Sequence, residues 1–340
     1  MLAHSPEALT RTLGGPGRAQ AVLGLLRRGR DPFTEGELAR SARARLALSC
    51  TPTTLKVAEA HDAPDQTVKL LVELEDARRV EMVVIPARDR TTLCVSSQVG
   101  CARGCRFCAT AAMGLVRNLR ADEISGQVFI GLRAARDRGL PAVRNVVLMG
   151  MGEPLDNGAE VAQALSLIAV EDGLGIGRRH VTVSTVGPSP AAILSTLAWP
   201  AHLAWSLHAA DDALRRRLVP TQRHSVEALR DAFAEVLAAR REPLFVEIAL
   251  VDGWNDDLEA AQRASALFRG FPAEVRINLL PMNPIDGPLT GSAPDRVTKF
   301  RDALIAEGYF CTVRRARGAV ERAACGQLAT RDRRAAAPTR

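Results

Sequence analysis

Aromatic residues are scarce in this chain: they make up 4% of its 340 residues and include a single tyrosine. Stacking platforms for single-stranded nucleic acid are therefore not evident from the composition. The chain also lacks a run of eighteen apolar residues, and its start, from Met1 to Ala19, lacks a basic segment followed by an apolar stretch and a small-residue cleavage site. These absences predict a soluble, cytoplasmic protein without a membrane segment.

A secreted disulfide framework is not indicated either. The seven cysteines are an odd number, and four of them lie between Cys94 and Cys108, which suits reduced thiols that hold a metal. Hydrophobic residues make up 47% of the chain, enough for one large α/β barrel with an appended domain. The net charge of +7 favours a polyanionic partner such as RNA, although a GC-rich genome would also supply the arginines.

Three of the clustered cysteines, Cys101, Cys105 and Cys108, form a C-x3-C-x2-C triplet. An iron–sulfur cube has four iron corners, and structural zinc usually takes four protein ligands. Three cysteines leave one iron open to a small chelating substrate, which is the pattern of radical S-adenosylmethionine enzymes. The alternative is a zinc knuckle whose fourth ligand lies elsewhere in the chain.

The N-terminal part reads as a small basic module. Short helices are expected between residues 18 and 48, with an apolar face and several exposed arginines: Arg27, Arg28, Arg30, Arg40, Arg43 and Arg45. This basic face either contacts RNA phosphates or is an ordinary solvated surface. Two strands are expected at 68–74 and 79–85, joined by a polar turn, and they would lead into the catalytic domain.

A regular alternation of strands and helices follows residue 90. Strands are expected at 92–98, 145–149, 180–185, 202–207, 244–250 and 274–280, and helices near 121–138, 158–170, 190–198, 225–240, 257–269 and 294–307. Six β-α units predict a parallel sheet with right-handed crossovers, either an open barrel or a doubly wound sheet. The chemistry is then expected on loops after the carboxyl ends of the strands.

Polar residues do stand at those loop positions. Gly152 permits close approach of the backbone to a ligand, and Glu153 can accept hydrogen bonds from a substrate ammonium group. Ser184 and Ser206 offer hydroxyls, and His208 is either a structural hydrogen-bonding group or a catalyst. The amide of Asn283 suits an adenine or ribose edge. Near the C-terminus, small residues flank Cys325, so that a flexible loop could present its sulfur.

Taken together, these motifs resemble the radical S-adenosylmethionine RNA methyltransferases that modify an adenine carbon. The resemblance spans residues 81–328 and rests on the cysteine triplet and on Thr-Leu-Cys-Val-Ser-Ser-Gln-Val-Gly-Cys, Gly-Met-Gly-Glu-Pro-Leu, Ser-Leu-His, Asn-Leu-Leu-Pro-Met-Asn-Pro and Ala-Cys-Gly-Gln-Leu. It implies an α/β fold, a partial (β/α)6 barrel at 91–310. It also implies a catalytic cysteine loop at 311–328. Residue patterns predict a helical module at 1–55 and a β connection at 56–90 before the barrel, and the polar, basic composition of 329–340 predicts a disordered tail.

The same resemblance implies roles for individual residues. Cys101, Cys105 and Cys108 would bind a 4Fe–4S cluster. Cys325 would carry the methyl group, Cys94 would later form a transient disulfide with it, and Glu81 would accept a proton. The contacts to S-adenosylmethionine, two molecules of which are used per turnover, would come from Gly152, Glu153, Ser184, Ser206, Leu207, His208 and Asn283.

The expected substrate is an adenine carbon of 23S rRNA or tRNA, with C2 favoured over C8, and the expected electron donor is a flavodoxin or ferredoxin. The protein is expected to act as a monomer. Ring carbons of this kind are not nucleophiles, so a methyl group held first on a thiolate explains the two cysteines outside the triplet. The alternatives are a radical enzyme that acts on another RNA or on a protein, and a zinc-bearing RNA-binding module. Cys50 and Cys311 are expected to be small buried thiols.

Overall fold

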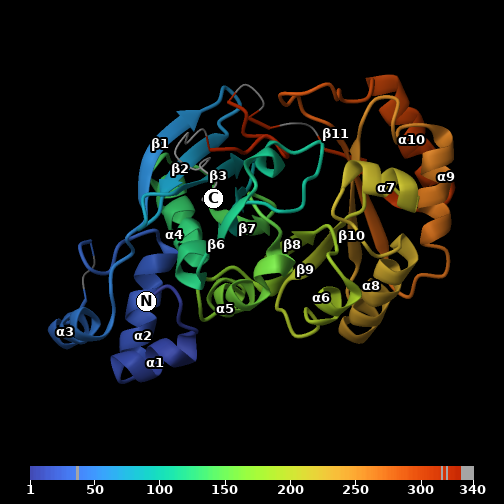
Figure 1. Cartoon of the computed structure of the whole chain (residues 1–340). Coiled ribbons are helices and arrows are strands. Elements are labelled where there is room, and N and C mark those ends of the chain that lie inside the picture. The colour runs from blue at the N-terminus through green and yellow to red at the C-terminus, as the bar shows by residue number, and fades with distance from the viewer. Residues whose placement is uncertain (36–37, 315–316, 319–320, 331–340) are drawn as a thin grey trace, which may run out of the picture.

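The N-terminal part of the computed structural model, which describes residues 1–35, 38–314, 317–318 and 321–330, is helical. Its three helices are α1 (Pro6–Leu13), α2 (Pro16–Arg27) and α3 (Arg40–Ser49), and they lie together at one end of the molecule beside α4 (Ala121–Asp137) (Figure 1). Ser5 caps α1 by accepting a hydrogen bond from the Ala8 N–H. Arg27 donates to the Gly173 carbonyl oxygen at 2.8 Å, so this arginine docks the helices onto the core.

A ten-stranded sheet crosses the whole molecule, in the order β1-β2-β3-β4-β7-β8-β9-β10-β11-β12. In the first four strands, each strand is antiparallel to its neighbour. They are β1 (Lys56–Asp62), β2 (Val68–Glu73), β3 (Arg79–Pro86) and β4 (Thr91–Cys94). Strands β2 and β3 were expected, but β1 was not, because nearly all of its residues are exposed and show no apolar alternation. The expected β connection is thus a direct extension of the catalytic sheet.

From β4 onward the neighbouring strands are parallel. They are β7 (Val143–Leu148), β8 (Val181–Thr185), β9 (His202–Ser206), β10 (Leu244–Leu250), β11 (Val275–Pro281) and β12 (Phe310–Val313). The helices between them include α5 (Gly158–Ile168), α6 (Pro190–Leu194), α7 (Asp212–Leu218), α8 (Val226–Arg240), α9 (Leu258–Leu267) and α10 (Pro294–Ala306). In Figure 1 the larger of these helices lie along one side of the sheet. The predicted α/β fold with successive β-α units is confirmed.

Two details of the prediction were wrong. The strand expected at 92–98 ends at Cys94, and β5 (Gln98–Gly100) pairs instead with β6 (Leu115–Asn118) in a separate two-stranded sheet. The chain leaves the main sheet where the Ser96 N–H bonds the Gln127 side chain and the Ser96 hydroxyl bonds the Glu81 carbonyl oxygen. In addition, the range expected as a cysteine loop begins with β12, a seventh parallel strand paired with β11.

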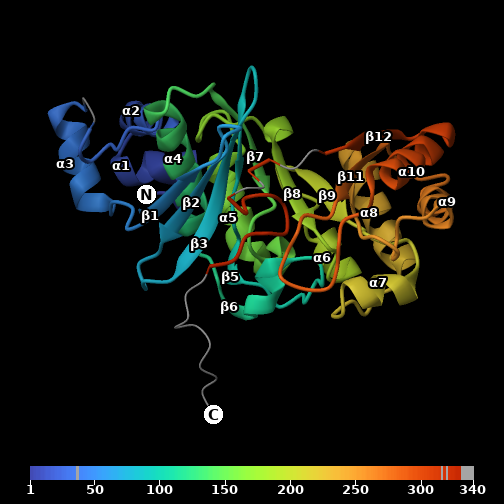
Figure 2. The same cartoon turned by 90° about the horizontal axis from the view of Figure 1, so that it is seen from above.

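The C-terminal segment returns across the concave side of the sheet (Figure 2). Its path is fixed by the Ala109 N–H, which donates to the Gly326 carbonyl oxygen at 2.7 Å, and by the Thr110 hydroxyl, which donates to the Leu328 carbonyl oxygen at 2.5 Å. Ala329, expected to begin a disordered tail, instead donates its N–H to Glu81. Residues 331–340 of that expected tail lie outside the described residues. No helix of the described ranges has the length and apolar character to cross a membrane.

Candidate active site

A cavity with about 990 Å³ of empty space, open to solvent, lies at the carboxyl ends of the parallel strands. The cavity brings together ten of the predicted site residues: Cys101, Cys105, Cys108, Gly152, Glu153, Ser184, Ser206, His208, Asn283 and Cys325. They come from loops that are far apart in the sequence, as expected when parallel strands end at one edge of a sheet.

The three cysteines of the triplet lie on one wall of this cavity, on the loop between β5 and the 3-10 helix at Ala109–Met113. Burial raises the pKa of the Cys101 thiol to about 12 and that of Cys105 well above its ordinary value, and the neighbouring thiols add to both effects. Thiols in such a place become thiolates when they bind a metal. Within the described ranges, no three His, Cys, Asp or Glu side chains converge on one ion position. A 4Fe–4S cluster takes each thiolate on a different iron and does not need that convergence.

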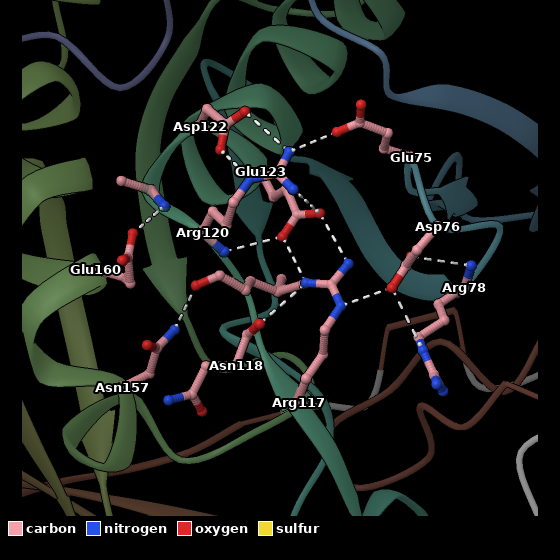
Figure 3. Close-up of polar contacts among 12 residues, drawn as sticks. Glu75, Asp76, Arg78, Arg117, Asn118, Arg120, Asp122, Glu123, Asn157 and Glu160 are labelled. Carbon is pink, nitrogen blue, oxygen red and sulfur yellow. Dashed lines mark hydrogen bonds and ion pairs between the residues drawn. The ribbon is translucent and has the colours of Figure 1, made fainter.

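Ion pairs hold the loop that carries the triplet and the strand that follows it, β6. Arg103, inside the loop, donates from Nε to Asp156 Oδ2 at 2.7 Å. Beyond the loop, Arg117 donates to both oxygens of Glu123, at 2.8 and 2.9 Å, and from Nε to Asp76 at 2.8 Å (Figure 3). Arg117 therefore joins β6, the first turn of α4 and the turn between β2 and β3.

Glu153 lines the same cavity and lies after β7. Its two carboxylate oxygens accept hydrogen bonds from the N–H groups of Leu155 at 3.0 Å and Val186 at 2.9 Å. Burial nevertheless raises the pKa of Glu153 to about 7. Gly152 has a φ of +103°, and a Cβ there would lie 2.6 Å from the Gln98 Cβ, so the glycine is required for the close packing of these two loops. The carboxylate is thus held rigidly toward the cavity.

Hydroxyls and an imidazole extend the wall along β8 and β9. The Ser184 and Ser206 hydroxyl oxygens are 3.0 Å apart. The Nδ1 of His208 accepts a hydrogen bond from the Ala249 N–H at 3.1 Å, which leaves the ring proton on Nε2. Burial lowers the pKa of His208 to about 3, and its ring packs on Phe107 with centroids 4.3 Å apart. His208 is therefore neutral and supports the cysteine loop.

Cys325 lines two cavities. It lines the cavity of the triplet and also a second one, which contains Cys94 and Arg314. Surrounding protein raises the pKa of the Cys325 thiol although solvent can reach the residue, and the nearby Arg314 opposes that rise. Burial also raises the pKa of Cys94 strongly, and the neighbouring Cys325 contributes. The two predicted reactive thiols are therefore close enough to influence each other.

Three predicted residues do not line the cavity of the triplet. The Leu207 side chain is fully buried in the core. Cys94 faces the second cavity, and Glu81 lines a third, polar pocket with Lys69. Glu81 is buried, with Oε1 3.3 Å from the Lys69 ammonium and Oε2 accepting from the Ala329 N–H at 2.9 Å. Burial raises the pKa of Glu81, and Lys69 opposes that rise.

Two charged residues of the site were not predicted from the sequence. Arg314 lies immediately after β12 and lines the second cavity together with both thiols. Glu247 lies in the middle of β10 and lines the first cavity. A signal for Glu247 was present, since it is the only charged residue in the strand sequence Leu-Phe-Val-Glu-Ile-Ala-Leu. Arg314 offered no such signal, because it stands among several basic residues.

This chain is similar in sequence and in fold to known proteins. The radical SAM superfamily matches residues 95–264. A protein of Sorangium cellulosum named "Dual-specificity RNA methyltransferase RlmN" is 38% identical over 371 aligned positions, covering 96% of this chain and 94% of that protein. One of the same name from Anaeromyxobacter is 42% identical, covering 86% of this chain and 79% of the relative.

A solved structure agrees with these sequence matches. The radical SAM methyltransferase from Sphaerobacter thermophilus superimposes with a TM-score of 0.88 at 35% identity, covering 96% of this chain and 98% of its own. The superfamily uses a 4Fe–4S cluster and S-adenosylmethionine, and the triplet fits that cluster as described above, which removes the zinc alternative. The chain belongs to the radical SAM superfamily, in the same family as these RNA methyltransferases.

Proposed function

We propose that the protein methylates an adenine ring carbon of 23S rRNA or tRNA, C2 in preference to C8, through a methyl group carried on Cys325. The observation that carries this proposal is the place of Cys325 between two cavities, one with the cysteine triplet and one with Cys94. An enzyme that only generates a radical on a protein substrate needs no such pair of thiols. The names of the relatives support RNA as the methyl acceptor.

Methyl transfer to Cys325 is the first role of the chain. An adenine carbon that bears hydrogen has no lone pair with which to displace the sulfonium methyl of S-adenosylmethionine, whereas a thiolate has one. The Cys325 sulfur forms the new bond to the methyl carbon, and S-adenosylhomocysteine leaves with the electron pair of the broken bond. Arg314 favours the thiolate form by its positive charge.

The residues around the first cavity have a binding role. Cys101, Cys105 and Cys108 would hold the 4Fe–4S cluster, and the contacts to S-adenosylmethionine would come from Gly152, Glu153, Ser184, Ser206, His208 and Asn283. When bound, the cluster supplies the electron that converts a second S-adenosylmethionine into the agent that activates the stored methyl group. The cavity places this chemistry next to Cys325, which lines it.

Release of the product uses Cys94 and Glu81. The Cys94 thiolate attacks the Cys325 sulfur, a disulfide forms, and the electron pair of the broken carbon–sulfur bond passes to the methyl carbon, which takes up a proton. Before this cleavage, the activated methyl carbon forms its bond to the ring carbon, and the adduct loses one electron, which would return to the bound cluster. Glu81 then accepts the hydrogen of the ring carbon as a proton. Burial raises the pKa of this glutamate, which makes it a better base than an ordinary surface carboxylate.

Exposed arginines on the N-terminal helices would bind the RNA. Arg28, Arg30, Arg40 and Arg45 are exposed on the N-terminal helices and suit contact with RNA phosphates. Electrons would come from a flavodoxin or ferredoxin, and the protein would act in the cytoplasm as a monomer. The cysteine pair would be reduced by cellular thiols before the next turnover.

The test is a comparison of three cysteine variants supplied with methyl-labelled S-adenosylmethionine. Cys325→Ala is expected to bind the cluster but to methylate no RNA, and Cys94→Ala is expected to accumulate protein joined covalently to RNA. Cys311→Ala, which removes a buried thiol outside both cavities, is the matched control and should retain activity. Mass spectrometry of digested RNA distinguishes 2-methyladenosine from 8-methyladenosine. Normal product from Cys325→Ala would refute the carrier role, and methylation of protein alone would favour the protein-modifying alternative.

A further inference from the structure

Strand β10 buries a carboxylate in an apolar setting. All but one of its residues are buried, and Glu247, at its centre, is only 4% exposed. A buried carboxylate is unfavourable unless donors surround it, and such a residue in the core has a specific partner as a rule. The partners of Glu247 therefore indicate its role.

Glu247 belongs to a row of polar side chains that crosses four parallel strands, β9 to β12, at one level. The backbone register pairs Ser206 of β9 with Glu247, Glu247 with Asn278 of β11, and Asn278 with Thr312 of β12. The Thr312 hydroxyl donates to Asn278 Oδ1 at 2.7 Å, and Asn278 Nδ2 donates to Glu247 Oε1 at 2.9 Å. At the other end of the row, the Ser184 and Ser206 hydroxyls are 3.0 Å apart.

The row is interrupted between Ser206 and Glu247. Within the described residues, the buried Oε2 of Glu247 has no hydrogen-bond partner. Arg314 Nη2 lies 3.5 Å from the other oxygen, Oε1. Both Glu247 and Ser206 line the cavity of the cysteine triplet, so a ligand in that cavity can reach the unpartnered oxygen. The missing donor is expected to come from such a ligand.

We propose that Glu247 accepts hydrogen bonds from the ribose hydroxyls of S-adenosylmethionine. Within this ligand the ammonium group is matched by Glu153, which lines the same cavity. The neutral donors left for a second carboxylate are the two ribose hydroxyls and the adenine amino group, and the two hydroxyls stand side by side on the ribose. Ala249, Leu280 and Met149 line the same cavity as Glu247, and their apolar groups suit the flat adenine. The inference rests on the nucleoside part of the proposed function and is independent of the methyl acceptor.

The test measures affinity and requires no turnover. Calorimetry on the cluster-loaded protein compares S-adenosylhomocysteine with its 2′-deoxy and 3′-deoxy analogues. A hydrogen bond to a charged group is expected to make the full ribose bind about tenfold more tightly than at least one deoxy analogue. In Glu247→Met this preference should fall to below about twofold, and in Glu247→Gln, which keeps the shape and a neutral amide, it should be intermediate.

A matched control and a second readout separate binding from folding. Glu274→Gln changes an exposed glutamate just before β11 that pairs only with Arg276 in the described structure, and it should keep the full preference. Cluster absorbance and the melting temperature report whether each variant is folded. Equal affinities of the wild-type protein for all three ligands would overturn the proposal without any variant, as would an undiminished preference in folded Glu247→Met. If the wild-type protein methylates no RNA but shows the preference, and Glu247→Met loses it, the ribose contact is supported and only the proposed function is refuted.

Discussion

The side-chain amide of Asn283 donates a hydrogen bond to the backbone carbonyl oxygen of Cys325, with an N···O distance of 3.0 Å. One partner follows strand β11, and the other lies on the C-terminal segment that crosses the sheet. Gln327 adds a second bond, from its amide to the Pro284 carbonyl oxygen at 2.8 Å. The sequence predicted that Asn283 contacts the nucleoside, and its position in the cavity fits that role. The residue also positions the loop of Cys325, the proposed methyl carrier.

Asn283→Ala is therefore expected to loosen the Cys325 loop. Loss of one hydrogen bond of about 1 kcal/mol corresponds to a roughly fivefold change, so alkylation of Cys325 by iodoacetamide should become about fivefold faster. Mass spectrometry of the alkylated peptide measures the rate, and Thr298→Ala on the exposed face of α10 serves as the control. An unchanged alkylation rate combined with a large loss of affinity for S-adenosylhomocysteine would show that Asn283 acts on the ligand instead.

Arg314 is expected to control the reactivity of both thiols in the second cavity. Its charge lowers the pKa of Cys94 and of Cys325, against the larger effect of burial. Arg314→Gln should shift the pH profile of Cys325 alkylation to higher pH, because less thiolate is present at a given pH. Arg314→Lys should restore most of the profile. A profile that does not move in Arg314→Gln would assign this arginine to Glu247 alone, from which it lies 3.5 Å.

The sequence predicted the six β-α units and the cavity residues because parallel strands bring their carboxyl ends to one edge, whatever their separation in the chain. It missed β1, an exposed edge strand without alternation, and β12, a strand of four residues. It could not place Glu81 and Cys94 relative to the triplet. Strands β3 and β4 fix these two residues, but the groups that face them come from the C-terminal segment, through contacts such as Ala329 to Glu81 that no local pattern encodes.

Arg117 clamps β6 to α4 through its ion pair with Glu123, and this clamp predicts a difference between Arg117 and the nearby Arg120. Glu123 is 1% exposed, and Arg117→Met would leave it with only the Arg120 backbone and a longer ion pair to Arg120. Breaking a buried pair in this way should lower the free energy of unfolding by about 3 kcal/mol. Arg120 is half-exposed and bonds mainly Asp122 and Glu75, so Arg120→Met should lower it by less than about 1 kcal/mol. Urea unfolding measures both, and equal losses would contradict the clamp (Figure 3).

The elevated pKa of Glu153 predicts that ligand affinity depends on pH in a defined direction. Burial raises this pKa to about 7, so the carboxylate that would accept the ligand ammonium is present above pH 7 and is lost as the pH falls through that value. The affinity of the cluster-loaded protein for S-adenosylhomocysteine should therefore decrease as the pH is lowered from 8 to 6, by at most about tenfold for each pH unit below the pKa.

Glu153→Gln should bind S-adenosylhomocysteine weakly at pH 6, 7 and 8, with little dependence on pH. Glu235→Gln, on the exposed face of α8, should behave like the wild type. Calorimetry at each pH provides the measurement. A slope that persists in Glu153→Gln would mean that another group in the cavity takes up the proton, and since His208 is already neutral throughout this range, the protein's cysteines would be the next groups to examine.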